Sequence, residues 1–171
     1  MSRDPRWPLA LTVALVVFVL DRGTKMLVER TMTLEQTIDL LPFFALTYVR
    51  NPGAAFGLFR SAPESWRVPL LLAVTAVAFV VLLAYLRDTP PERRGVVVAL
   101  GAVLGGALGN LYCRARFGEV IDFFHLHWGG WSWPMFNVAD SAITMGVIAL
   151  LVSSLGDARK TSRSRSEPAA R

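Results

Sequence analysis

The run "MFNVADSAITMGVIALLVSSLG" (residues 135–156) carries one acidic residue, Asp140, near the start of an otherwise apolar segment. The segment is long enough for a helix that crosses the hydrocarbon core of a membrane, which needs about 20 residues. A carboxylate inside such a helix costs about 2.5–3.5 kcal/mol on insertion scales. The run therefore predicts a membrane helix, and it predicts that Asp140 has a use that justifies its place there.

Three further apolar segments accompany this one in a chain of 171 residues, of which 53% are hydrophobic and 18% charged. Average soluble chains carry about 25% charged residues. The four segments are residues 7–28, 66–86, 95–111 and 133–155. Because they lack the alternation of barrel strands, they can cross a membrane only as helices. The sequence predicts an all-α membrane protein with four transmembrane helices in residues 1–156, followed by a basic, disordered tail in residues 157–171.

The first segment could also be read as a cleaved signal peptide, since Arg3 and Arg6 precede an apolar core. No small-x-small cleavage site follows that core. We therefore expect a retained helix that carries Asp21 within it or at its outer end.

The basic residues predict the orientation of the chain, whose net charge is +5. Ten of the 18 basic residues lie in short segments on one side of the predicted membrane: Arg3, Arg6, Arg87, Arg93, Arg94, Arg159, Lys160, Arg163, Arg165 and Arg171. The positive-inside rule then puts both termini in the cytoplasm. Loops 29–65 and 112–132 face outward and form a small extracytoplasmic cap. This distribution indicates a membrane topology, and no nucleic-acid partner is expected.

Polar residues of three segments fall at one predicted depth. At 1.5 Å per residue, Asp140 lies about 10 Å and Asp21 about 9 Å below the outer surface. Asn110 lies at nearly the same depth, and Asn137 lies one turn outward of Asp140. The second segment contributes only Thr75 and is interpreted as scaffold.

The third segment repeats glycine every four residues, at Gly101, Gly105 and Gly109. Such a stripe lets a neighbouring helix approach closely. Plain helix packing explains the stripe as well as any functional role does.

Asp122 lies in the outer loop within the apolar stretch "VIDFF" (120–124), where it is poorly solvated. If the loop folds back, Asp122 can meet Asp140. Two carboxyl groups in one pocket of low dielectric share a proton, because both cannot ionise cheaply. Such a pair can take a proton from water on one side and give one to a carbonyl oxygen on the other, which is the chemistry of peptide hydrolysis.

Three other readings stay open on the residues alone. Asp21 could be a structural ion-pair partner of a nearby base, for which the candidates are Arg22, Lys25 and Arg114. Buried acids are also typical of a small proton-coupled transporter. A metal site could use Cys113, Asp122, His125 and His127.

Five blocks of sequence resemble, in order and spacing, the signature motifs of the bacterial lipoprotein signal peptidase (signal peptidase II) family. They are "DRGTK" (21–25), "NPGAAFG" (51–57), "GGALGNLYCR" (105–114), "GEVIDFF" (118–124) and "FNVADS" (136–141). The resemblance implies an aspartic protease of the bacterial cytoplasmic membrane. Its substrates are diacylglyceryl-modified prolipoproteins, cut just before the lipidated cysteine.

Matched position by position, the resemblance implies Asp122 and Asp140 as the catalytic pair. The positions that it implies as substrate-binding or supporting are Asp21, Lys25, Asn51, Gly53, Asn110, Arg114, Asn137 and Ala139. It further implies an active site near the outer leaflet and contact with membrane phospholipid. No metal or organic cofactor is expected, and a monomer is expected because all the site residues come from one chain.

The chain departs from the family at Cys113, where an Asp is usual directly before Arg114. The missing acid is expected to have anchored Arg114. A catalytically weakened homologue that binds lipopeptides is therefore the alternative within the family, and the proton-coupled transporter is the alternative outside it.

Overall fold

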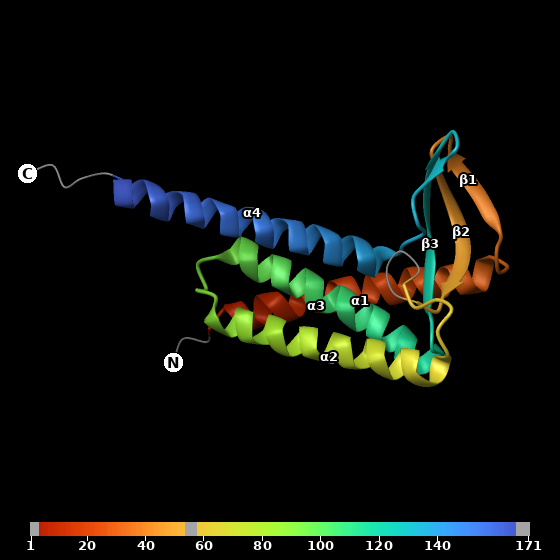
Figure 1. Cartoon of the computed structure of the whole chain (residues 1–171), viewed down its shortest axis with the longest axis horizontal. Helices are drawn as coiled ribbons and strands as arrows, with labels where there is room; N and C mark the ends of the chain where they lie inside the picture. The colour runs from red at the N-terminus through yellow and green to blue at the C-terminus, as the bar shows by residue number, and fades with distance from the viewer. Residues whose placement is uncertain (1–3, 54–57, 167–171) are drawn as a thin grey trace, which may run out of the picture.

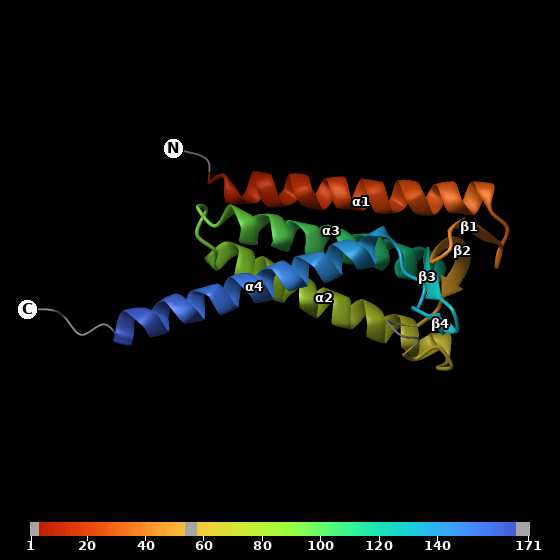
Figure 2. The same cartoon turned by 90° about the horizontal axis from the view of Figure 1, so that it is seen from above.

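The computed structural model of the chain describes residues 4–53 and 58–166. Its four helices are α1 (Arg6–Thr31), α2 (Glu64–Asp88), α3 (Arg94–Phe117) and α4 (Val138–Ser166). The helices run along the long axis of the molecule, and a small sheet stands across one end of them (Figure 1). Helix α3 packs against each of the other three helices, so it forms the centre of the bundle (Figure 2).

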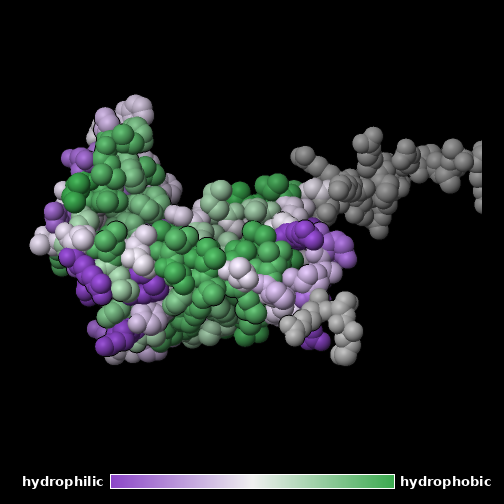
Figure 3. All heavy atoms as spheres, turned by 180° about the vertical axis from the view of Figure 1, so that it is seen from behind, coloured by the Kyte–Doolittle hydropathy of each residue, from purple (hydrophilic) through white to green (hydrophobic). Residues whose placement is uncertain are grey.

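Three helices of the described chain are long and apolar enough to cross a membrane: α2, α3 and residues Val138–Gly156 of α4. Helix α1 has 26 residues and is not among these three. Hydrophobic side chains cover the middle of the bundle, and hydrophilic residues gather towards its ends (Figure 3). Few residues of α2 are buried, which agrees with its interpretation as scaffold.

The expectation of an all-α protein is wrong, because the structure contains a four-stranded antiparallel sheet. Its strands are β1 (Thr37–Leu41), β2 (Phe44–Asn51), β3 (Val120–Trp128) and β4 (Trp131–Ser132), in that order across the sheet. Two strands come from each of the two loops that were predicted to form a cap. All three longer strands are rich in β-branched or aromatic residues, which favour extended backbone.

The sheet is held on the end of α1 by a cluster of buried apolar side chains. Val28 and Met32 of α1 pack with Tyr48 of β2 and with Ile121 and Phe123 of β3. Because Ile121 and Phe123 flank Asp122, this cluster fixes the position of that carboxyl group.

The chain passes from α3 into β3 through Gly118, whose φ of 74° lies in the left-handed region. Glycine adopts this conformation without the steric penalty that a Cβ adds, so it ends the helix and turns the chain. The turn leaves Asp122 only five residues beyond the end of α3.

Helix α4 begins later than the sequence predicts. Residues 133–137 run back along β3: the N–H of Trp133 donates to the oxygen of Leu126, and Phe136 pairs with Phe124. Asp140 therefore lies in the first turn of α4, and the depth counted from residue 133 is wrong. At its other end α4 stays helical through Ser166, where disorder was predicted from residue 157; residues 167–171 lie outside the described chain.

The glycine stripe of α3 is a packing seam, as one of its two readings predicts. A Cβ at Gly105 would lie 2.5 Å from the oxygen and 2.8 Å from the Cα of Ala14 in α1. Gly101 meets Ala10 in the same way. On the other side of α3, a Cβ at Gly106 would lie 2.5 Å from the oxygen of Ala139 in α4. The seam draws α1 and α4 close to the same helix.

Substitution of Gly105 by alanine tests the seam. The gain in helix propensity, up to about 1 kcal/mol, is expected to be outweighed by overpacking that costs about 1–3 kcal/mol. Gly105→Ala should therefore lower the unfolding temperature in detergent. The matched control is Gly23→Ala in α1, where a Cβ meets nothing within 4 Å. Equal unfolding temperatures for the two variants would contradict the seam.

Candidate active site

Asp122, the third residue of β3, is 2% exposed and is held by two side-chain amides. Its carboxylate accepts hydrogen bonds from Asn137 Nδ2 (2.6 Å) and Asn51 Nδ2 (3.0 Å). Burial, which disfavours the charged form, raises the pKa of Asp122 to about 7, and the nearby charge of Asp140 acts in the same direction. The two amide bonds oppose this shift. The carboxyl group is therefore poised to exchange a proton near neutral pH.

Asp140 is fixed by a reciprocal pair of bonds at the start of α4. Its backbone N–H donates to Asn137 Oδ1 (2.9 Å), and its Oδ2 accepts from the backbone N–H of Asn137 (3.1 Å). This is a capping box, in which the N-cap residue and the third helical residue satisfy each other's free N–H groups. Its remaining oxygen, Oδ1, accepts from Asn110 Nδ2 (2.8 Å). Asp140 is half-buried.

One residue, Asn137, thus joins the two acids. Its Nδ2 bonds Asp122, while its Oδ1 and backbone N–H bond Asp140. Asn137 is fully buried. Asn137 therefore links the carboxyl group of β3 to that of α4.

Behind this group, Asp21 and Lys25 of α1 form an ion pair that is 0% exposed on both sides. Lys25 Nζ lies 2.8 Å from Asp21 Oδ2 and donates to Asn110 Oδ1 (2.8 Å). Asp21 Oδ1 accepts from the backbone N–H of Ala139 (3.0 Å). The network ties α1, α3 and α4 together. The predicted meeting of polar groups from three segments is confirmed, and the ion-pair partner of Asp21 is Lys25.

Arg114 projects from the last turn of α3 towards the loop after β2. Its Nη2 donates to the oxygen of Gly53 (3.2 Å). Its buried Nε finds no acceptor within the part of the chain that the structure describes. Residues 54–57 of the "NPGAAFG" block lie outside that part. The N–H of Gly53 in turn donates to Asn51 Oδ1 (3.0 Å). This bond orients the side-chain amide of Asn51 so that its Nδ2 donates to Asp122.

The side chain at position 113 bonds an arginine other than Arg114. Cys113 is fully buried, and its Sγ accepts from Arg22 Nη1 (3.1 Å). Arg22 also stacks over the ring of Tyr112, at 4.6 Å from its centroid. The expectation that an acid at this position anchors Arg114 stays a prediction, because this chain carries cysteine there.

The residues of the suggested metal site are engaged elsewhere. His125 bonds Thr47 and Ser132 through its two ring nitrogens, and His127 lies 4.0 Å from Asp39. Over residues 4–53 and 58–166, no three His, Cys, Asp or Glu side chains are grouped so that they could hold a metal ion.

Sequence reasoning missed Arg50, which fixes the end of β2 beside Asn51. Its guanidinium donates to Glu119 (3.0 Å), Glu29 (3.3 Å) and the hydroxyl of Tyr48 (3.1 Å). These bonds join β2 to the ends of α1 and α3. The signal in the sequence that could have identified Arg50 was its position directly before Asn51, the first residue of the "NPGAAFG" block.

Two carboxyl groups, each held by amide donors, lie where an apolar helix bundle meets a sheet, an arrangement compatible with an aspartic hydrolase. Comparisons with known proteins name the family. A family model described as "Signal peptidase (SPase) II" matches residues 13–156. The chain belongs to this family of aspartic endopeptidases.

Similar proteins cover most of the chain. The lipoprotein signal peptidase of Syntrophotalea carbinolica is 45% identical over 86% of this chain and 91% of its own. That of Geobacter metallireducens is 41% identical over 93% and 98%, respectively. A solved structure described as "Bacterial membrane enzyme structure by the in meso method at 2.3 A resolution" superposes with a TM-score of 0.79. It is 29% identical and covers 93% of both chains.

Proposed function

We propose that the chain removes signal peptides from diacylglyceryl-modified prolipoproteins by cutting just before the lipidated cysteine, with Asp122 and Asp140 as the catalytic pair. Membership of the signal peptidase II family supports cleavage of prolipoproteins. The observation that carries the assignment of the pair is the shared bonding to Asn137. This bonding holds a carboxyl group of β3 and a carboxyl group of α4 on the same residue.

In the proposed reaction one member of the pair is ionised and the other protonated. The carboxylate takes a proton from a water molecule, whose oxygen bonds to the carbonyl carbon of the substrate. The protonated member gives its proton to the carbonyl oxygen, so a neutral tetrahedral diol forms. The member that is now protonated gives its proton to the amide nitrogen, and a hydroxyl of the diol gives its proton to the other member as the C–N bond breaks. A carboxylic acid and an amine leave, and the pair is again singly protonated.

Arg114 and Asn51 are proposed to hold the substrate backbone. The buried Nε of Arg114 provides an N–H donor beside the pair. A backbone carbonyl of the substrate can accept from it and offset the penalty of an unpaired polar group in an apolar site.

For the topology we propose four spans, including α1, in the bacterial cytoplasmic membrane, with both termini in the cytoplasm. The start of α1 and the end of α4 lie at the end of the bundle opposite the sheet (Figure 1), which supports four spans with both ends on one side. The acid pair then lies near the outer leaflet, where the lipid-anchored cysteine of a prolipoprotein is held. We further propose that the enzyme acts as a monomer in contact with phospholipid.

Two forms of one precursor test the function. Purified protein is incubated in detergent with a prolipoprotein that carries diacylglycerol and with the same precursor without lipid. Mass spectrometry should find cleavage just before the cysteine in the lipidated form alone. Equal cleavage of both forms would overturn the proposed specificity. Binding of the lipidated form without cleavage would identify a weakened, lipopeptide-binding homologue.

The raised pKa of Asp122 predicts how activity depends on pH. Above about pH 7 its remaining proton is lost, and a doubly ionised pair has no proton for the carbonyl oxygen. We expect kcat/KM to fall as pH rises through about 7.

Asn51→Ala removes a bond that stabilises the ionised form of Asp122, so the pKa rises further and the alkaline limb should move to higher pH. Profiles of kcat/KM between about pH 5 and 9 in detergent measure the alkaline limb of the parent and that of the variant. An Asn51→Ala profile that is lower but unshifted would contradict this role for Asn51.

A further inference from the structure

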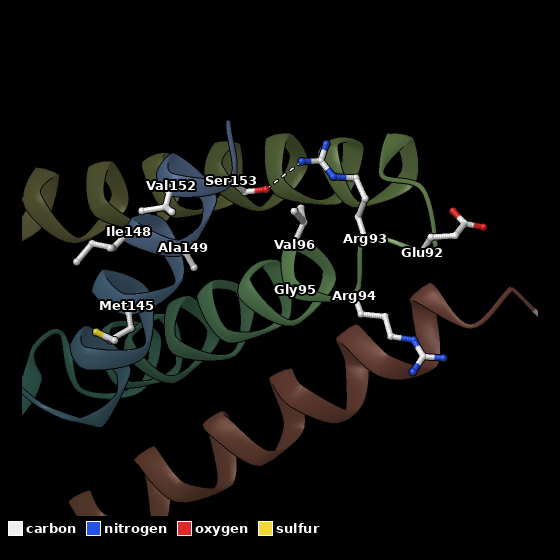
Figure 4. A pocket seen from close by; sticks show the side chains of 10 residues that line it. All are labelled: Glu92, Arg93, Arg94, Gly95, Val96, Met145, Ile148, Ala149, Val152 and Ser153. Atoms are coloured by element: carbon white, nitrogen blue, oxygen red, sulfur yellow. Dashed lines mark hydrogen bonds between the residues drawn. The ribbon is translucent and has the colours of Figure 1, made fainter. Parts of the chain in front are cut away.

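A hollow that is separate from the proposed active site lies at the end of the bundle away from the sheet. It has a volume of about 620 Å³ and opens between the first turn of α3 and the middle of α4 (Figure 4). Its apolar walls are formed by Gly95, Val96, Met145, Ile148, Ala149 and Val152. Arg94 precedes Asn110 by 16 residues of helix, about 24 Å, so this groove is separate from the acid pair.

Two arginines, Arg93 and Arg94, are among the described residues at the mouth of the groove. Arg93 reaches across to α4, where its Nη2 donates to Ser153 Oγ (2.9 Å). Arg94 is exposed and extends the other way, towards α1 (Figure 4). Among the described residues of the lining, Glu92 is the one acid, and its carboxylate points away from the apolar walls (Figure 4). The groove is therefore an apolar trough with cations at one end.

We propose that this groove binds an anionic phospholipid, with an acyl chain along the apolar walls and the phosphate at Arg93 and Arg94. The shape and charge match such an amphiphile, since basic pockets between membrane helices hold acidic head groups. Val152 is 64% exposed and Met145 67%, so the walls are open to lipid. The position of the lipid in the cytoplasmic leaflet rests on the proposed topology, whereas the groove and its charge do not.

A signal peptide is the other candidate occupant of an apolar groove in this family. Its first residues are positively charged. Arg93 and Arg94 repel such a segment and attract a phosphate. The charge therefore favours the lipid.

Native mass spectrometry of the full chain in detergent tests the site. Phosphatidylglycerol is added stepwise and compared with phosphatidylcholine of the same acyl chains and with inorganic phosphate. We expect one phosphatidylglycerol to stay bound at concentrations where phosphatidylcholine is lost. Arg93→Gln/Arg94→Gln should weaken its binding by roughly tenfold or more, because each basic residue near the head group adds attraction. Arg116→Gln removes one positive charge at the other end of α3 and should bind normally.

Gly95→Leu tests the trough without touching a charge. A Cβ at Gly95 meets nothing within 4 Å, so the side chain can occupy the groove without displacing its neighbours. It should also weaken phosphatidylglycerol binding, while cleavage of prolipoprotein reports that each variant is folded.

Three results would overturn the proposal. The first is equal binding of the two phospholipids. The second is unchanged binding in the arginine or glycine variants. The third is full displacement of the lipid by inorganic phosphate or by prolipoprotein, which would mark a phosphate site or a signal-peptide groove.

Discussion

Asp140→Asn and Asp122→Asn are each expected to lower kcat/KM by at least about 10³-fold, because either change leaves the pair unable to exchange a proton. The fold should survive. The new amide keeps one acceptor oxygen for the bond that Asn137 donates and loses the bond from Asn51 or Asn110. Rates of cleavage of a diacylglyceryl prolipoprotein measure the loss, and unfolding temperatures in detergent confirm that each variant is folded.

A matched control is Asp39→Asn, on the exposed strand β1 of the same sheet, where the side chain is 77% exposed. It makes the same chemical change away from the pair and should leave kcat/KM unchanged. Chelation with EDTA should also have no effect on the parent enzyme. Cleavage by either pair variant at the parent's rate would remove that residue from the catalytic role.

The largest loss of stability is expected for Lys25→Met. It leaves the carboxylate of Asp21 buried, fully inaccessible and without its cation. Breaking a buried ion pair in this way costs about 3–5 kcal/mol. Asn110 also loses one of the two donors on its Oδ1, so both stability and cleavage should fall. Thermal unfolding in detergent measures the first effect.

The double variant Asp21→Asn/Lys25→Met separates charge from packing. The amide at position 21 still accepts the backbone N–H of Ala139 and carries no charge. We expect the double variant to recover most of the lost unfolding temperature, because replacing both partners of a buried pair is often close to neutral. A double variant as unstable as Lys25→Met would show that the methionine fails through its shape.

The four helices could be predicted from apolar length, whereas the sheet and the start of α4 could not be predicted in the same way. Residues 133–136 are as apolar as the helix that follows, so composition does not separate them. What stops the helix is a long-range contact, the pairing of Phe136 with Phe124 of β3. The local signal is the Asn137-x-x-Asp140 spacing of a capping box, which marks the start of a helix.

The polar site was more predictable than its surroundings. Asp21, Asn110 and Asn137 are joined through the network that their shared depth predicts. A buried polar group in an apolar bundle needs a hydrogen-bonding partner, and few such partners exist there. The position of each polar residue along its helix therefore nearly decides which residues bond one another. The contacts of Arg22 and Arg114 could not be foreseen, because both side chains are long and each has several acceptors within reach.

The pairing of Asp21 with Lys25 within one helix has a consequence for how the protein is made. The two charges are one turn apart, so they neutralise each other as soon as α1 is helical. On the proposed topology, α1 can leave the insertion machinery for lipid before any other helix exists. Asn110 then arrives with α3, and Ala139 with α4. The proposed catalytic pair is completed last, when the first turn of α4, the last of the four described helices to be synthesised, docks against α1.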